Sequence, residues 1–314
     1  MKKITIYIPT YNRSKSLLKQ LEAINTCYNK SNIQVVVSNN DSADIDGYNL
    51  VEEFCCKNKF LYIKNSINIG ADANIFNGFL NSFNSEYIWI LSDDDLLKDN
   101  AVDAILEILS HNDLDILFLT FLSKIKTLEV HNWTQNDFYE NNLKTGDGAG
   151  LISNVIYRSG FIKESIPVGF QNIYTCFCHL AVLIHSLKNK IFKVGNIGDF
   201  NFFISGTSLP PEDYSIYSKS YFGFVLLGHL FEDEVGRKFI NNWVGFWNLK
   251  NWYTKKRDKI SEQNYIYAKA YIVKKISTFG LYSFKLKLFF WYFASPFFIL
   301  IRRIRNVILR RKYP

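Results

Sequence analysis

Three carboxylates in a row, Asp93, Asp94 and Asp95, follow the apolar run at residues 87–91 after a single serine. Carboxylates this close repel one another, and burying them without partners costs free energy. Hard divalent cations prefer oxygen ligands, and magnesium commonly takes one or two carboxylates together with phosphate oxygens of a substrate. The triplet therefore predicts a site for Mg²⁺ or Mn²⁺ on a diphosphate. A solvated surface turn is the alternative, and the buried strand expected before the triplet weakens it.

Two other polar loops have the same relation to apolar runs. Residues 9–12 (Pro-Thr-Tyr-Asn) end a run at 4–8, and residues 38–42 (Ser-Asn-Asn-Asp-Ser) end a run at 33–37. β-Branched and aromatic runs of this length, stopped by turn-forming residues, are typical of strands. In an open α/β sheet, ligands bind outside the carboxyl ends of the strands. The polar loops are therefore expected where a binding site should be.

The elements that must position these loops alternate along the chain. Further strands are expected at 60–63, 87–91 and 116–119, and helices at 14–24, 74–83 and 101–109. The first helix has apolar residues at helical spacing, and Ser14 is placed to cap it. Strands and helices that repeat at this spacing predict an α/β fold, with a mainly parallel, Rossmann-like sheet flanked by helices.

The character of the chain changes after Pro210 and Pro211, where long, aromatic-rich helical stretches begin. A length of 314 residues suits one large domain, or a domain with a smaller appendage. We therefore predict one α/β domain over residues 1–210 and a helical C-terminal region over residues 211–314.

The C-terminal region ends in an apolar segment followed by a basic one. Residues 286–301 contain one charge, Lys287, and residues 302–312 contain six cations. The apolar segment is shorter than the about 20 residues that a membrane-spanning helix needs. Aromatic apolar residues next to a cationic cluster favour a segment that lies in the interface of an anionic membrane. A helix buried against the first domain, with a solvated basic tail, is the alternative.

Charge and cysteine content narrow the class of partner and the compartment. The formal net charge of +8 suits a phosphate-bearing ligand or an anionic membrane. Nucleic acid ranks last as a partner, because no zinc-finger spacing or RNA-binding signature accompanies the charge. Five cysteines without a regular framework, and no signal peptide before the first strand, indicate reduced thiols in the cytoplasm. The prediction is a cytoplasmic protein, peripheral to the inner face of the cell membrane.

Four motifs then occur in register: Pro-Thr-Tyr-Asn at 9–12, residues 38–44, residues 68–74, and Ser-Asp-Asp-Asp at 92–95. Together they resemble family 2 glycosyltransferases of the GT-A fold, clearly so over residues 1–120. Further along, the chain is similar to the bacterial O-antigen abequosyltransferase-like branch. The resemblance implies a metal-dependent, inverting hexosyl- or deoxyhexosyltransferase that uses a nucleotide-sugar donor. With the C-terminal segment, it suggests a lipid-linked glycan acceptor in the synthesis of a bacterial surface polysaccharide, such as lipopolysaccharide or capsule.

The resemblance also assigns roles by position. The residues that it places beside the nucleotide are Pro9, Thr10, Tyr11, Asn12, Asn39, Asn40, Gly70, Asp72, Asn74 and Asp93. Asn39 and Asn40 stand where the family offers an acid to the base, and an amide can both donate and accept, so the base is left open. The family's DXD motif maps onto residues 92–94. Asp94 is therefore the first choice as metal ligand, with Asp93 and Asp95 in support.

The catalytic base has the weakest signal. The family uses an Asp or Glu in this region, yet residues 171–187 contain no acid. His179 lies in that stretch, and a histidine with a near-neutral pKa can take the proton of an acceptor hydroxyl. His179 could equally be a metal ligand or an ordinary helix histidine, and Asp147 and Glu164 are the other candidate bases. Arg158 is either a phosphate contact or a surface arginine.

Two other functions fit parts of the pattern. A nucleotidyltransferase on a similar sheet needs a glycine-rich, lysine-bearing phosphate loop after the first strand, and residues 9–16 do not supply one. A non-catalytic glycan- or membrane-binding relative would explain the missing acid near residue 171. An assay of transfer and donor hydrolysis with a panel of nucleotide sugars separates the three functions.

Overall fold

The computed structural model describes residues 1–82, 84–120, 125–144, 148–204, 223–224 and 226–243. The chain divides into two compact units, Met1–Gly236 and Arg237–Pro314. The boundary expected near residue 210 lies outside the described residues and stays a prediction, as does the C-terminal segment 286–314. Within the described part of the chain, no helix has the length and apolar character to cross a membrane.

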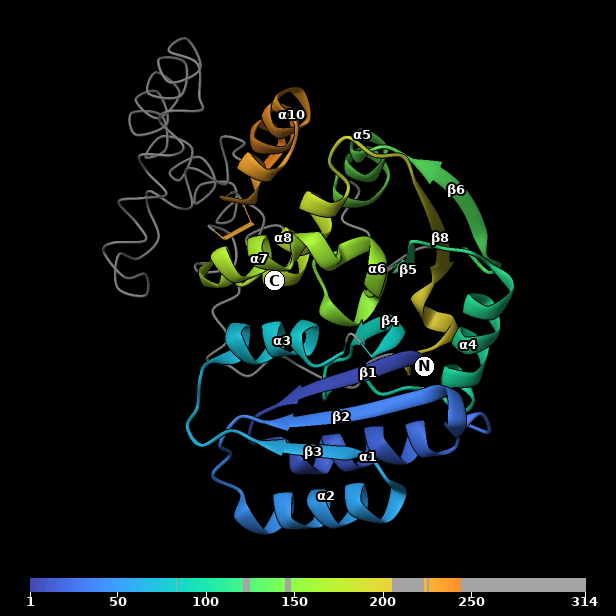
Figure 1. Cartoon of the computed structure of the whole chain (residues 1–314), viewed down its shortest axis with the longest axis vertical. Helices are drawn as coiled ribbons and strands as arrows, with labels where there is room; N and C mark the ends of the chain where they lie inside the picture. Colours follow the sequence, from blue (N-terminus) through green and yellow to red (C-terminus); the bar gives the residue numbers. More distant parts are fainter. Residues whose placement is uncertain (83, 121–124, 145–147, 205–222, 225, 244–314) are drawn as a thin grey trace, which may run out of the picture. The chain divides into compact units, whose positions relative to one another are not determined.

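The core of the first unit is an eight-stranded mixed sheet in the order β3-β2-β1-β4-β7-β5-β8-β6 (Figure 1). The strands are β1 (Lys2–Thr10), β2 (Ile33–Asn39), β3 (Leu61–Lys64), β4 (Ser85–Ile90), β5 (Ile116–Thr120), β6 (Glu129–Trp133), β7 (Val155–Arg158) and β8 (Phe192–Gly198). β3, β2, β1 and β4 are parallel neighbours, and β5 pairs parallel with β8. β7 and β6 run antiparallel to their neighbours. The mainly parallel sheet predicted from the sequence is confirmed.

The helices are α1 (Ser14–Asn25), α2 (Ile45–Asn58), α3 (Ala71–Leu80), α4 (Ala101–His111), α5 (Gln135–Phe138), α6 (Ser159–Ile162), α7 (Ile166–Gln171), α8 (Cys178–Ser186) and α10 (Asp233–Trp243). Figure 1 shows α1 and α2 on one face of the β1–β3 part of the sheet and α3 on the other, and α7 and α8 pack against α3. α4 shares a face with α1, because its Ile105 belongs to the same buried cluster as Leu17 and Leu21. The predicted α/β fold with flanking helices is confirmed.

Side chains of β1 point alternately to the two faces of the sheet, so this strand packs against helices on both faces. Ile4, Ile6 and Ile8 belong to the cluster beneath α1. Tyr7 points to the opposite face, where its hydroxyl donates to the backbone carbonyl of Asn74 on α3 at 3.1 Å. Successive strand side chains point to opposite faces, and here both faces are covered by helices. For this reason β1 is a nearly continuous apolar run in the sequence.

The C-terminal ends of β1, β2 and β4 lie at one edge of the sheet, because the three strands are parallel neighbours. Leu91 N extends the pairing of β4 by donating to Tyr7 O at 2.9 Å, and Asn40 N donates to Thr10 O at 3.0 Å. Beyond these pairings the chain leaves the sheet. The structure therefore brings the polar loops after β1, β2 and β4 to the same edge.

Candidate active site

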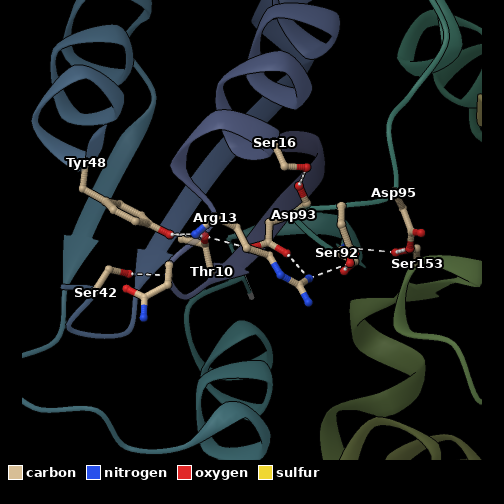
Figure 2. Close-up of polar contacts among 11 residues, drawn as sticks. Thr10, Arg13, Ser16, Ser42, Tyr48, Ser92, Asp93, Asp95 and Ser153 are labelled. Carbon is tan, nitrogen blue, oxygen red and sulfur yellow. Dashed lines mark hydrogen bonds and ion pairs between the residues drawn. The ribbon is translucent and has the colours of Figure 1, made fainter. Parts of the chain in front are cut away.

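The aspartate turn (residues 92–95) follows β4 and lies against the loop after β1 (Figure 2). Asp93 is 4% exposed. Its Oδ2 accepts a hydrogen bond from Thr10 Oγ1 at 2.8 Å, and its backbone carbonyl accepts one from Ser16 Oγ at 2.8 Å. Burial raises the pKa of Asp93 to about 6, although Arg13 and Thr10 oppose the rise. Asp93 therefore faces the protein and ties the turn to β1 and α1.

Arg13 links the first two aspartates of the turn. Its Nη1 lies 3.0 Å from Asp93 Oδ1 and 2.6 Å from Asp94 Oδ2. The other oxygen of Asp94 accepts a hydrogen bond from Ser92 Oγ at 2.5 Å. The Asp94 side chain is 21% exposed, against 6% for Asp93. Asp94 is thus the more accessible carboxylate, and Arg13 places a positive charge where both carboxylates converge.

Asp95 is held from a different part of the chain. Its Oδ2 accepts a hydrogen bond from Ser153 Oγ at 2.6 Å, and the same Ser153 oxygen accepts one from Ser92 N at 2.9 Å. Burial raises the pKa of Asp95, Ser153 lowers it, and the charges of Asp94 and Asp199 raise it further. Asp199 directly follows β8, whose C-terminal end shares this edge of the sheet. Asp199 is therefore a further acid near the turn.

Hydrogen bonds join the end of β1 and the loop after it to α2 and to the loop after β2. Thr10 Oγ1 lies 2.6 Å from the hydroxyl of Tyr48 on α2. Asn12, with a φ of +54°, donates from its backbone N to Ser42 Oγ at 2.9 Å, and its Oδ1 accepts a backbone N–H of the second loop. Tyr11, which precedes it, is 45% exposed. The structure thus brings Thr10 to the aspartates and leaves the ring of Tyr11 accessible.

The amides of Asn39 and Asn40 are engaged within the protein. Asn39 Oδ1 accepts from Ser42 N at 3.0 Å, and its Nδ2 donates to the Tyr62 hydroxyl at 2.8 Å. Asn40 Nδ2 donates to Asn68 Oδ1 at 2.9 Å, and its Oδ1 accepts from two further donors of that loop. Both side chains are buried. These amides hold the loops in shape, and a contact from either to a nucleobase stays a prediction.

The start of α3 lies beside the end of β2. Gly70, which precedes the helix, has a φ of +86°, in the left-handed region that favours glycine. Asn74 Oδ1 accepts from Ser38 Oγ at 2.7 Å, and its Nδ2 donates to Ser38 O at 3.0 Å. Ser38 is the partner of Pro9 in the register of β1 and β2. With Asp72 half-buried in the first turn of α3, these predicted nucleotide-binding residues gather at the same edge.

His179, the first candidate base, lies on α8 and is 2% exposed. Its Nε2 lies 3.0 Å from Gly150 O, and its Nδ1 has no hydrogen-bond partner among the described residues. Burial lowers the pKa of His179 to about 4, although the contact with Gly150 opposes the fall. The imidazole is therefore neutral near pH 7, and Nε2 carries the hydrogen that the carbonyl accepts. Glu164 is exposed in the short helix Lys163–Ser165, and Asp147 lies outside the described residues.

Arg158 lies at the other edge of the sheet. β7 runs antiparallel to β4, and Arg158 is the register partner of Tyr87, near the start of β4. Its guanidinium forms an ion pair with Asp113 and lies 5.3 Å from the centre of the Tyr87 ring. Its Nε donates to Leu114 O at 2.8 Å. The structure therefore does not bring this predicted phosphate contact to the aspartate turn.

Three residues near the aspartate turn could hardly be identified from the sequence: Arg13, Ser153 and Asp199. Arg13 directly follows the motif at 9–12, and that adjacency is the one available clue. Ser153 lies 58 residues from Asp95 along the chain, and no local pattern marks it or Asp199. Only the fold brings them to the turn.

A comparison with known families assigns the chain to a family. The family model described as Glycosyl transferase family 2 matches residues 5–192, which is more than half of the chain. The matched range begins in β1 and includes the aspartate turn and α8. The chain belongs to glycosyl transferase family 2. The family predicted from the four motifs is thereby confirmed.

Curated relatives within this family match part of the chain. Abequosyltransferase RfbV of Salmonella typhimurium is 27% identical over 169 residues, which are 53% of this chain and 49% of RfbV. Glycosyltransferase GlyA of Streptococcus pneumoniae serotype 4 is 26% identical over 202 residues, which are 63% of this chain and 27% of GlyA. The chain thus spans about half or less of the length of these relatives.

Two solved structures of S. aureus TarS share the fold. S. aureus TarS 1–349 is similar with a TM-score of 0.60 and 14% identity, over 87% of this chain and 80% of the TarS chain. TarS 1–349 in complex with UDP-GlcNAc gives a TM-score of 0.61 and 15% identity, over 88% of this chain and 82% of that chain. At this level of identity the similarity concerns the fold alone, and the predicted GT-A fold is confirmed.

The carboxylates of this family 2 site fit a divalent cation that is shared with a ligand. Asp93 and Asp94 already converge on a positive charge, the guanidinium of Arg13. Within the described ranges, no three His, Cys, Asp or Glu side chains are grouped so that they could hold a metal by themselves. Magnesium commonly takes only one or two carboxylates when phosphate oxygens complete its shell. The turn therefore suits a cation that a phosphate-bearing ligand helps to hold.

Proposed function

We propose that the chain transfers a hexosyl or deoxyhexosyl unit from a nucleotide-sugar donor to a glycan acceptor. The observation that carries the proposal is the meeting of Thr10, Arg13 and the aspartate turn at the C-terminal edge of parallel strands. Ligands of open α/β sheets bind at such an edge. Membership of family 2 supports this reaction class, as does similarity to a relative named abequosyltransferase.

The nucleotide would lie along the loops after β1 and β2, with its diphosphate toward the aspartate turn. Tyr11 offers an exposed ring at this edge. Gly70 leaves room for a ligand to approach the backbone, and the N-terminus of α3 that follows it favours negative charge. The TarS complex with UDP-GlcNAc, which has the same fold, supports a nucleotide-sugar donor.

Asp94 and Asp95 would hold Mg²⁺ or Mn²⁺, with Asp93 in support. A cation bound there supplies neutralisation of the charge that develops on the leaving diphosphate. Asp93 is engaged by Thr10 and Arg13, so its part is to fix the turn, whereas Asp94 has the more exposed carboxylate. Arg13 compensates the negative charge of the turn before the donor arrives.

Transfer with inversion needs a base that takes the proton of the acceptor hydroxyl. His179 is buried, and its Nε2 contacts the carbonyl of Gly150. Asp147 precedes Gly150 by three positions in the sequence. The burial of His179 therefore favours Asp147 as the base, with His179 holding the segment that follows it.

We further propose that the acceptor is a lipid-linked glycan at the inner face of the cell membrane. The support is the apolar segment 286–301 and the six cations within 302–312. Such a pairing suits the interface of an anionic membrane. Transfer at that surface would serve the synthesis of a bacterial surface polysaccharide.

The direct test incubates the full chain with UDP-, GDP-, CDP- and dTDP-sugars and MnCl₂, and follows the release of nucleoside diphosphate. We expect slow hydrolysis of one donor, which EDTA abolishes and which added lipid-linked glycan converts into transfer. Release of pyrophosphate from a nucleoside triphosphate would instead favour a nucleotidyltransferase. Binding of a donor without turnover would favour a non-catalytic relative. The absence of any acid from residues 171–187 is the observation that supports this alternative. Binding of no donor would overturn the proposal.

A further inference from the structure

Ser153, a buried serine from a distant part of the chain, contacts the aspartate turn at two points and β4 at a third. It is 0% exposed and lies in the short helix Ile152–Asn154, which precedes β7. Its Oγ donates to Asp95 Oδ2 at 2.6 Å and accepts from Ser92 N at 2.9 Å (Figure 2). Its carbonyl accepts from Trp89 Nε1 on β4 at 2.7 Å. One residue thus holds the strand, the first residue of the turn and the last carboxylate.

The two contacts of Ser153 Oγ fix the direction of its hydroxyl hydrogen. A serine hydroxyl has one hydrogen to donate and two lone pairs with which to accept. The N–H of Ser92 occupies a lone pair, so the hydrogen is left for Asp95. A hydrogen bond to an ionised carboxylate is roughly twice as strong as one between neutral groups. Ser153 therefore sets the orientation of the Asp95 carboxylate and does more than fill space.

The other two aspartates are held from the opposite side of the turn. Arg13, from the loop after β1, contacts Asp93 and Asp94. Among the described residues, the hydrogen bond that reaches the Asp95 carboxylate comes from Ser153. Removal of the Ser153 hydroxyl should therefore release Asp95 and leave Ser92 N without this acceptor, while Arg13 still holds Asp93 and Asp94.

We infer that Ser153 is a positioning residue for the cation-binding end of the donor site, and that it acts through Asp95 without touching substrate. The inference rests on the proposed function, because it takes Asp95 as a ligand of the cation. Removing a partner that orients a metal ligand typically costs about 10- to 100-fold in metal affinity or activity. A buried serine with a purely structural role would change stability and leave the affinity for the cation unchanged.

The test compares Ser153→Ala with Ser85→Ala in the full chain. Ser85 lies at the other end of β4, is also buried, and its Oγ lies 2.7 Å from Thr5 Oγ1, so each variant loses one buried hydroxyl. Mn²⁺ binding is titrated by electron paramagnetic resonance, in the presence of whichever of UDP, GDP, CDP and dTDP the wild type binds most tightly. Thermal unfolding is recorded without ligand. Both variants should lower Tm, and Ser153→Ala alone should weaken Mn²⁺ binding, by about tenfold or more.

Two further variants make the test independent of folding defects. Ser153→Cys replaces the hydroxyl with a slightly larger thiol that is still a weak donor, so its loss of Mn²⁺ affinity should be smaller. In an Asp95→Asn background, Ser153→Ala should lower the affinity for Mn²⁺ by less than about threefold. The effects of two substitutions do not add when one residue acts through the other.

Four outcomes separate the inference from the proposed function. An unchanged Mn²⁺ affinity in folded Ser153→Ala overturns the inference, and so does an undiminished loss in the Asp95→Asn background. Loss of folding in both Ser153 variants, while Ser85→Ala folds, also overturns it. A wild type that binds no Mn²⁺ with any of the four nucleotides contradicts the proposed metal dependence instead.

Discussion

Arg13 brings one guanidinium nitrogen within 3.0 Å of Asp93 and 2.6 Å of Asp94. Without the positive charge of this guanidinium, the adjacent carboxylates of Asp93 and Asp94 would repel each other after the end of β4. The end of β1 supplies a hydroxyl donor, Thr10, to this turn, and the loop that follows supplies a counter-ion, Arg13. The turn is compensated before any ligand arrives, and a divalent cation would share carboxylates that Arg13 already contacts.

Replacing Arg13 with Gln should make the stability of the protein depend on an added cation. Breaking a buried ion pair costs about 3–5 kcal/mol. The Arg13 side chain is 31% exposed, so we expect a smaller loss of about 1–3 kcal/mol in the free energy of unfolding. Thermal unfolding with and without MnCl₂ checks this, and Mn²⁺ should raise the Tm of Arg13→Gln more than that of the wild type.

Lys144→Gln is the matched control for Arg13→Gln. Lys144 forms an ion pair with Glu140 at 2.6 Å on an exposed helix surface. Exposed pairs of this kind contribute little, so Tm should hardly change and Mn²⁺ should act as it does on the wild type. If Mn²⁺ raised the Tm of Arg13→Gln and of the wild type equally, the guanidinium and the cation would not share the carboxylates.

Asp94→Asn should abolish transfer and leave the fold intact. The substitution keeps the shape of the side chain, and Arg13 keeps its ion pair with Asp93. Loss of a group that stabilises developing charge lowers kcat by about hundredfold or more, and EDTA should reproduce the effect in the wild type. Initial rates with the best donor provide the measurement. Asp113→Asn, at the opposite edge beside Arg158, should keep wild-type rates. Full turnover in Asp94→Asn would assign the cation to other residues.

The position of the site could be predicted because three strands stop at polar residues. β1, β2 and β4 are covered on both faces, so they are continuous apolar runs in the sequence, and their ends are sharp. The direction of β7 could not be predicted, because composition does not show which way a strand runs. β7 is antiparallel to β4. Arg158, at its end, therefore lies away from the aspartates, and Ser153, just before its start, lies beside Asp95.

The hydrogen-bond partners of the polar residues could not be predicted either. Amides that follow a strand suggest ligand contacts, yet Asn39, Asn40 and Asn74 pair with neighbouring loops and strands. Asparagine side chains readily satisfy backbone groups of nearby turns, and a sequence pattern does not distinguish that use from recognition. The burial of His179 could not be predicted from the sequence either. α8 is buried on nearly all sides, so it has no polar face from which exposure could be inferred.

Removing residues 286–314 should abolish binding to anionic membranes. Co-sedimentation of the full chain and of residues 1–285 with phosphatidylglycerol or phosphatidylcholine vesicles provides the measurement. The full chain should bind the anionic vesicles and should be released by salt, because cations near such a surface contribute about 1 kcal/mol each and are screened. Exchanging the six cations within 302–312 for glutamine should remove the salt dependence. Equal sedimentation of the truncated and full chains would contradict an anchor in this segment.

His179 should contribute a pH dependence to stability. Burial lowers its pKa from 6.5 to about 4 on folding, with the Gly150 contact opposing. Between these values the unfolded chain binds a proton that the folded chain does not, so the free energy of unfolding falls as pH falls through this window. The size of the effect is on the order of 3 kcal/mol. Urea unfolding between about pH 7.5 and 4 should show a flatter dependence for His179→Gln, whereas exposed His111→Gln should follow the wild type. Parallel curves for His179→Gln and the wild type would contradict the burial.

The same variant decides which residue takes the acceptor's proton. A glutamine can still donate to Gly150 O, but it cannot act as a base. General bases contribute about 10²- to 10⁴-fold to the rate. If His179 only holds the chain at Gly150, His179→Gln keeps kcat/KM within about tenfold of the wild type, and Asp147→Asn lowers it by at least about a hundredfold. The reverse result would assign His179 as the base. Since its pKa is about 4, a His179 base would stay unprotonated throughout the neutral range, so kcat/KM of the wild type would show no fall near pH 6.5.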